Sequence, residues 1–162
     1  MVGLDNRVSA DPGTAAFQVS KYPFYLLNRL VGRYNETIGR RLQSIGLDIP
    51  SWRVLMILGE SSPRGVGDIA TAAVIPLSTM TRIIQRMELA GFVRSSPSPK
   101  DARVTEVCLT RLGRAKTAEA RKAAAPVYRN LIRGIEENEF DQLLELLERL
   151  YVNLDLGRSD VR

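Results

Sequence analysis

Short polar and basic side chains gather in two neighbouring stretches of this sequence. The first stretch carries hydroxyl, amide and guanidinium groups at spacings that place them on one side of a helix: Ser78, Thr79, Thr81, Arg82, Gln85 and Arg86. The second stretch, a few residues later, contains Lys100, Asp101 and Arg103. Such groups exchange hydrogen bonds with base edges and neutralise phosphate, so this pattern favours contact with double-stranded DNA.

The same sequence offers little for covalent or metal chemistry. It has no histidine, which is the most frequent general base, and a single cysteine, Cys108. We therefore expect no catalytic residue, no metal and no cofactor, and an enzyme is the least favoured class of protein. Cys108 has no second cysteine to pair with, and it falls in an expected strand, so we interpret it as a buried structural thiol.

The positive charge of the chain is concentrated in one part of it. Of the net charge of +5, the stretch Pro76–Arg114 supplies +4, from seven basic and three acidic residues. Acidic residues gather instead between 136 and 148. A basic half of this kind suits a polyanionic partner. The single cysteine, the absence of a long apolar run and the lack of a secretory pattern at the N-terminus predict a cytoplasmic protein without a membrane partner.

The first part of the chain predicts a loose arm followed by two helices. Residues 1–20 are poor in large apolar groups, whereas apolar residues recur every three or four positions from Pro23 until Gly46. Asp48 is placed to cap the next helix, with Pro50 in its first turn. Residues 59–67 are predicted to form a polar loop.

Two short helices and a hairpin are expected next. Helices over 68–73 and 77–89 are separated by Val74-Ile75-Pro76, where proline disfavours helical backbone at the preceding residue. Gly91 is a natural helix stop, after which the apolar period changes to two. Strands over 92–96 and 104–109 then enclose a tip that begins with Pro97. This order predicts a helix-turn-helix with a basic wing.

The last part of the chain predicts a helical region that seeks a partner. Thr110 can cap a helix that runs toward Ile135, and Pro126 should either kink it or break it. Asn138 can cap a final helix, whose apolar face is broader than one neighbour requires. That face comprises Phe140, Leu143, Leu144, Leu147, Leu150, Tyr151 and Leu154.

The expected fold class is mainly α with a small β-hairpin wing. We predict one compact domain, in which a winged helix-turn-helix over 48–109 forms the DNA-binding lobe. The N- and C-terminal helices, over 21–47 and 110–156, would form a helical dimerisation lobe. A two-fold homodimer would recognise a palindromic operator with half-sites about one DNA turn apart.

Several segments, in this order and spacing, resemble the MarR family of transcription regulators, from about Pro23 to Leu156. They are Trp52–Leu55, Ile69–Ala70, Ser78–Ile84, Met87–Val93, Lys100–Arg103 and Leu109–Arg114. The resemblance implies that Asp101 orients Arg103 toward the minor groove, and that the first and last helices form a dimer. The chain departs from the family pattern at Val74, where glycine is frequent, at Pro76 and Leu77, and at Ala102.

The resulting functional prediction is a sequence-specific regulator of transcription, a repressor released by a small aromatic or lipophilic ligand. The resemblance implies a ligand crevice between the first two helices, and Tyr25, Tyr34, Trp52 and Arg53 are its candidate lining. Activation instead of repression is also compatible with these residues. The alternative is a winged-helix module for protein–protein interaction that never binds DNA. The basic recognition face argues against that alternative.

Overall fold

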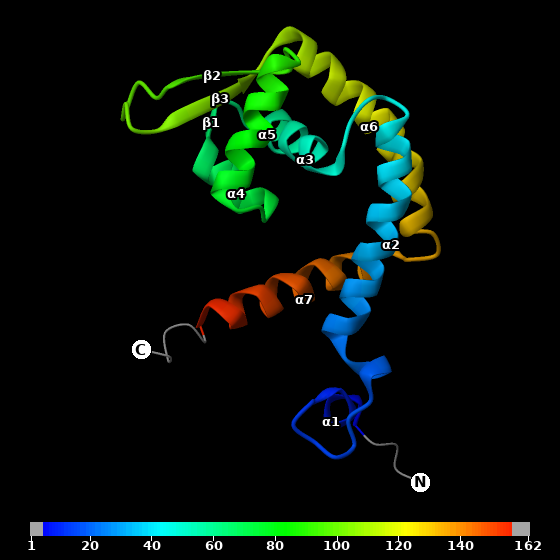
Figure 1. Ribbon diagram of the computed structural model, residues 1–162. Helices are drawn as coiled ribbons and strands as arrows, with labels where there is room; N and C mark the ends of the chain where they lie inside the picture. The colour runs from blue at the N-terminus through cyan, green and yellow to red at the C-terminus, as the bar shows by residue number, and fades with distance from the viewer. Residues whose placement is uncertain (1–4, 157–162) are drawn as a thin grey trace. The chain divides into compact units, whose positions relative to one another are not determined.

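The computed structural model describes residues 5–156, and it confirms a mainly helical chain with a small antiparallel sheet. The chain divides into two compact units, Met1–Val127 and Tyr128–Arg162, where the sequence predicted a single one. In chain order (Figure 1), the elements are α1 (Asn6–Ala10), η1 (Val19–Lys21), α2 (Pro23–Gln43), α3 (Ile49–Glu60), β1 (Arg64–Gly65), α4 (Val66–Ala73), α5 (Leu77–Leu89), β2 (Val93–Pro97), β3 (Thr105–Leu109), α6 (Arg111–Leu131) and α7 (Glu137–Leu156).

The N-terminal segment is more ordered than the predicted loose arm. Asp5 caps α1 by accepting a hydrogen bond from the backbone N–H of Arg7 at 2.9 Å. The backbone N–H of Gln18 then donates to the carbonyl of Ser9 at 2.8 Å, which closes the segment on itself. A low content of large apolar residues therefore did not prevent local order, because backbone and capping bonds supply it. Residues 1–4 of the predicted arm lie outside the described residues.

Helices α2 and α3 meet at the turn that the sequence predicted. Gly46 adopts a positive φ of 73°, and Asp48 caps α3 by accepting from the backbone N–H of Ser51 at 2.9 Å. Leu42 of α2 and Leu55 of α3 are fully buried in one apolar core. That core also takes in α4, α5 and β3, so the helix-turn-helix rests on a rigid base.

The break between α4 and α5 occurs at Val74, a residue that rarely tolerates this geometry. Val74 lies in the left-handed region, with φ of 53° and ψ of 50°. The backbone N–H of Ile75 donates to the carbonyl of Ala70 at 3.0 Å, which closes the end of α4. The chain therefore makes with valine a turn for which glycine is better suited.

The sheet has a third strand that the sequence did not reveal. Its order is β1-β3-β2, and the pairs of β1 with β3 are Arg64 with Val107 and Gly65 with Glu106. The prediction of a polar loop over 59–67 was therefore wrong at β1. Two residues are too short to show a strand period, and only the returning β3 supplies their partner.

A tight corner connects α5, the hairpin and α6. Gly91 ends α5 with φ of 74°, and the hydroxyl of Thr110 donates to its carbonyl at 2.6 Å. Thr110 Oγ1 also accepts from the backbone N–H of Gly113 at 2.9 Å, which caps α6 as predicted. A Cβ at Gly113 would lie 1.9 Å from the carbonyl oxygen of Phe92. Only glycine allows α6 to start this close to the hairpin.

The C-terminal helices show how Pro126 is accommodated and where the last helix begins. Pro126 lies inside the continuous helix α6, so it does not separate two helices. Asn138 lies inside α7 and does not cap it, because the Glu139 carboxylate accepts from the backbone N–H of Glu136 at 2.9 Å just before the helix begins. None of the helices in the described part of the chain combines the length and apolar character that a membrane span requires.

Candidate nucleic-acid interface

Helix α5 presents a polar face to solvent and an apolar face to the core. Met80, Ile83, Ile84 and Met87 are buried. All six polar residues singled out on this helix are exposed: Ser78, Thr79, Thr81, Arg82, Gln85 and Arg86. The helical period thus sorts the two sets, and buried contacts hold α5 while its outer face remains available.

The N-terminus of α5 carries backbone donors as well as side chains. Pro76 precedes the helix and provides no side-chain cap. The first backbone N–H groups of a helix lack intrahelical acceptors, so those of Ser78 and Thr79 are available to an anion. The hydroxyl of Thr81 donates to the carbonyl of Leu77 at 2.9 Å, which fixes its direction and leaves its oxygen free to accept.

The wing tip is held by a small set of side-chain bonds. Asp101 Oδ1 accepts from the backbone N–H of Arg103 at 2.9 Å. The buried hydroxyl of Ser98 donates to Glu106 Oε1 at 2.7 Å and accepts from the backbone N–H of Lys100 at 3.3 Å. Lys100 and Arg103 themselves are exposed. Asp101 therefore orders the turn that carries Arg103, through the backbone of that arginine.

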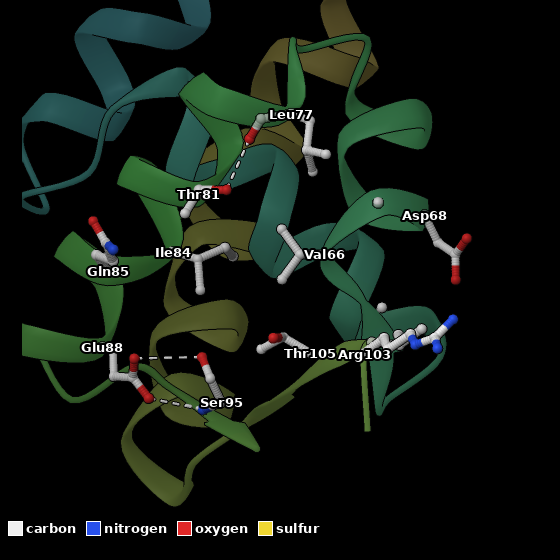
Figure 2. A pocket seen from close by; sticks show the side chains of 13 residues that line it. Val66, Asp68, Leu77, Thr81, Ile84, Gln85, Glu88, Ser95, Arg103 and Thr105 are labelled. Atoms are coloured by element: carbon white, nitrogen blue, oxygen red, sulfur yellow. Dashed lines mark hydrogen bonds between the residues drawn. The ribbon is translucent and has the colours of Figure 1, made fainter. Parts of the chain in front are cut away.

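The wing and α5 border a common groove. Its volume is about 650 Å³, and it is lined by Thr81 and Gln85 of α5 and by Arg103 near the wing tip, among others. Figure 2 shows Gln85 and Glu88 on one side of this groove and Arg103 with Asp68 on the other. The fold thus brings together residues that are about twenty positions apart in the sequence.

Arg86 differs from the other polar residues of α5. Its Nη2 contacts Asp48 Oδ2 in an ion pair and donates to the hydroxyl of Ser51 at 3.1 Å, so it bridges α5 to the start of α3. Burial raises the pKa of Asp48, but hydrogen bonds from Ser51 and the charge of Arg86 outweigh it and hold that pKa below its ordinary value. Arg86 is therefore engaged within the protein.

Sequence similarity to known proteins identifies the family of this chain. Residues 47–105 match the family model described as MarR family. The chain is 37% identical over 145 residues to the HTH-type transcriptional repressor IacR of Pseudomonas putida, covering 90% of this chain and 87% of that protein. The chain belongs to the MarR family. It is a DNA-binding transcription regulator, as the sequence predicted.

Solved MarR-family structures agree with this fold. A MarR-family regulator from Silicibacter pomeroyi is 27% identical with a TM-score of 0.78, over 86% of this chain and 94% of its own. The transcriptional repressor CouR, bound to a 23-mer DNA duplex, is 25% identical with a TM-score of 0.72, over 83% and 98%. These proteins are transcription regulators rather than enzymes, and the alternative of a protein–protein module finds no support among them.

The structure gathers only part of the predicted ligand crevice of this MarR-family chain. Trp52 and Arg53 line an open pocket of about 450 Å³ beside the end of α4, and Arg53 Nη1 donates to the carbonyl of Ala73 at 3.0 Å. Tyr34 packs partly buried against the core instead. Tyr25 is exposed, with the Arg29 guanidinium 5.6 Å from the centre of its ring. Neither tyrosine lines this pocket.

Cys108 is less buried than the sequence predicted. It is half-buried in the central strand β3, where it pairs across the hairpin with Arg94. Cys108 lines a pocket together with Arg111 and Arg114 of α6, separate from the pocket of Trp52. Within residues 5–156, no group of three or more histidine, cysteine or acidic side chains is placed to hold a metal ion.

Most residues that line this groove were not predicted from the sequence, and two of them join α5 to the hairpin. Glu88 and Ser95 form hydrogen bonds between α5 and β2 and line the groove of Figure 2. The only signal for Glu88 was an acidic residue within a basic stretch. Its partner could not be predicted, because the pairing depends on how the hairpin folds back against α5.

Proposed function

We propose that this MarR-family chain is a repressor that binds a palindromic operator as a homodimer and is released by a small aromatic or lipophilic acid. The observation that carries the DNA part is the shared groove, in which Thr81 and Gln85 of α5 and Arg103 of the wing border one space. A helix and a hairpin arranged in this way suit the major groove and the adjacent minor groove of one duplex.

The contacts divide by chemistry. Ser78, Thr79 and the free N–H groups of α5 suit phosphate, which fixes register. Arg82 and Gln85 have the length and the donors to read guanine and adenine edges. Arg103 suits the narrow, negative minor groove of A·T-rich DNA, and Lys100 a nearby phosphate. Base contacts would then define the operator, and phosphate contacts would set salt dependence.

A homodimer follows from the apolar residues that α7 leaves exposed. Leu144, Leu147, Leu150 and Leu154 are between 39% and 62% exposed. Apolar side chains in such number on one helix favour a protein partner. A second copy of the chain places two recognition helices about a two-fold axis, which is the reason to expect a palindrome.

The effector proposal rests on the pocket beside α4. Trp52, although largely buried, borders this pocket, and Arg53 supplies a guanidinium there, which together suit an aromatic carboxylate. Arg53 also donates to the last residue of α4, directly before the break that leads to α5. A ligand that draws Arg53 away would change the support of the recognition helix and could favour a conformation with weaker DNA binding. We also propose a cytoplasmic location, where operators lie.

The test is selection of binding sites from random duplex DNA at two salt concentrations. We compare the wild type with Arg103→Ala and with a control, Arg94→Ala. Each variant loses one exposed arginine of the hairpin, so both lose the same positive charge. We expect an enriched palindrome, and a loss of about tenfold in affinity for Arg103→Ala alone. No enrichment, with equally weak binding by all three proteins, would contradict the proposed function.

A further inference from the structure

The carboxylate of Glu88 joins the recognition helix to the wing. Its Oε1 accepts from the backbone N–H of Ser95 at 2.8 Å, and its Oε2 accepts from the hydroxyl of Ser95 at 3.3 Å. Both oxygens are therefore used, as the dashed lines of Figure 2 show. Two bonds to one residue fix the direction of a side chain better than one does.

The bonds of Glu88 lie at an edge of the sheet. In the order β1-β3-β2, strand β2 pairs only with β3, so one side of β2 has backbone groups without a strand partner. The N–H of Ser95 donates to Glu88 on that side. An edge strand covered by a helix carboxylate gains a fixed distance from that helix and loses a site for unwanted pairing.

The three acidic residues of the basic stretch serve related purposes. Asp101 holds the turn at Arg103, Glu106 holds the buried Ser98, and Glu88 holds β2. A negative charge beside bound DNA carries an electrostatic cost, because it faces phosphates. The presence of Glu88 on the recognition helix therefore needs a compensating role, and its two bonds to the wing provide one.

From this geometry we propose that Glu88 is a positioning residue for DNA binding. It sets the wing against α5 so that Arg103 and the exposed residues of α5 reach one duplex together. A wing that swung freely would lose conformational freedom on binding, and the contact made by Arg103 would contribute less. This inference rests on the proposed function, since it concerns how two DNA contacts are made at the same time.

The test is a double-mutant cycle on operator affinity with Glu88→Ala, Arg103→Ala and the double variant. We expect Glu88→Ala to weaken binding by about tenfold, although it removes a negative charge. In the Glu88→Ala background, adding Arg103→Ala should then weaken operator affinity by only about twofold, whereas the same substitution weakens it by about tenfold in the wild-type background. A purely electrostatic role of Glu88 predicts the opposite sign, namely tighter binding by Glu88→Ala.

Conservative and matched variants separate the bonds from the charge. Glu88→Gln keeps an oxygen that accepts from Ser95 while losing the charge, so it should restore most of the affinity. Glu119→Ala, which removes one exposed carboxylate of α6, is the control for charge and should not couple to Arg103. Additive effects of Glu88→Ala and Arg103→Ala, or no loss in Glu88→Ala, would overturn the inference.

A measurement without DNA keeps the test independent of the operator. Hydrogen exchange at the amide of Ser95 should be faster in Glu88→Ala than in wild type, with unchanged exchange in α3. If Glu88→Ala does not fold, Ser95→Ala removes only the hydroxyl bond and should give a smaller loss of affinity, with a correspondingly smaller coupling to Arg103. A wild type that selects no operator would refute the proposed function, whereas selection without coupling would refute only the role of Glu88.

Discussion

The arginines of the basic stretch are not equivalent, although all are exposed. Arg86 reaches across to Asp48 and Ser51 of α3, whereas Arg82 makes no ion pair in the described part of the chain. A guanidinium already bonded to a carboxylate must give up that partner before it can bind phosphate, which reduces its net gain. We therefore assign Arg82 to DNA and Arg86 first to the packing of α5 on α3.

This assignment predicts opposite effects for two alanine variants. Arg82→Ala should lower operator affinity by about tenfold and leave the free energy of unfolding unchanged. Arg86→Ala should lower the free energy of unfolding by about 0.5 kcal/mol, a value discounted because the ion pair is about half exposed. Urea unfolding and DNA titration measure the two quantities. Equal losses of affinity, with equal salt slopes, would assign both arginines to DNA.

The lowered pKa of Asp48 predicts a pH dependence of stability. A carboxyl whose pKa is lower in the folded protein stabilises it above the unfolded pKa of about 3.9, and that contribution is lost as the pH falls through the folded value. Asp48→Asn retains the cap but not the charge, so it should be less stable than wild type by about 0.5 kcal/mol near neutral pH. The gap should close at acidic pH, and Arg86→Ala should narrow it at neutral pH. A gap that does not change with pH would contradict this account.

At the scale of elements, two special backbone positions determine how the helix-turn-helix and wing are connected. Gly113 allows α6 to start against the carbonyl of Phe92. Val74 adopts the left-handed geometry that ends α4 while its side chain is 86% exposed. A β-branched residue in this region is strained, and an exposed side chain returns little packing energy for that strain.

The strain at Val74 predicts a stabilising substitution. Val74→Gly should raise the free energy of unfolding by about 1 kcal/mol. Glycine adopts a positive φ without steric strain, and the strain relieved in the folded state exceeds the entropy that glycine adds to the unfolded state. The control is Ala72→Gly, two residues earlier and exposed within α4, which should lower it by about 1 kcal/mol. Denaturant unfolding compares the two. A Val74→Gly variant less stable than wild type would show that the valine makes a contact worth more than its strain.

In the molecule as a whole, the candidate DNA contacts and the exposed leucines of α7 lie in different units. The basic stretch belongs to the first compact unit, and the exposed leucines of α7 belong to the second. DNA binding and self-association would therefore use separate surfaces, so a change in one can be tested without altering the chemistry of the other. Affinity for a palindrome nevertheless depends on both, because two half-sites require two copies.

The dimer predicts that one charge in α7 weakens both assembly and DNA binding. Leu150→Glu should shift the protein toward monomer, since burying an unpaired carboxylate in an apolar interface is unfavourable. Operator affinity should fall, and half-site affinity should be retained. Arg149→Glu, which at 100° per residue lies about 160° around the helix from Leu147 in the middle of the apolar face of α7, should remain dimeric. Sedimentation velocity gives the assembly state, and a monomeric wild type would contradict the proposed dimer.

The elements that could be predicted from the sequence are those whose cause is local. The bounds of α5 agree with the prediction, and so do the caps at Asp48 and Thr110 and the stop at Gly91, because periodicity, capping and backbone preference act within a few residues. The exposed face of α5 followed from the same period. The resemblance to the MarR family also required only the residues, order and spacing of its segments along the chain.

Contacts between residues distant in the sequence became visible only in the folded chain. It engaged Arg86 with Asp48, paired β1 with β3, joined Glu88 to Ser95 and separated Tyr25 and Tyr34 from the pocket of Trp52. None of these pairings has a periodic or compositional signal, because each depends on the direction in which packed helices and a folded-back hairpin present their side chains. The sequence therefore predicts which residues are available for DNA, and the packing decides which of them are committed to holding the others in place.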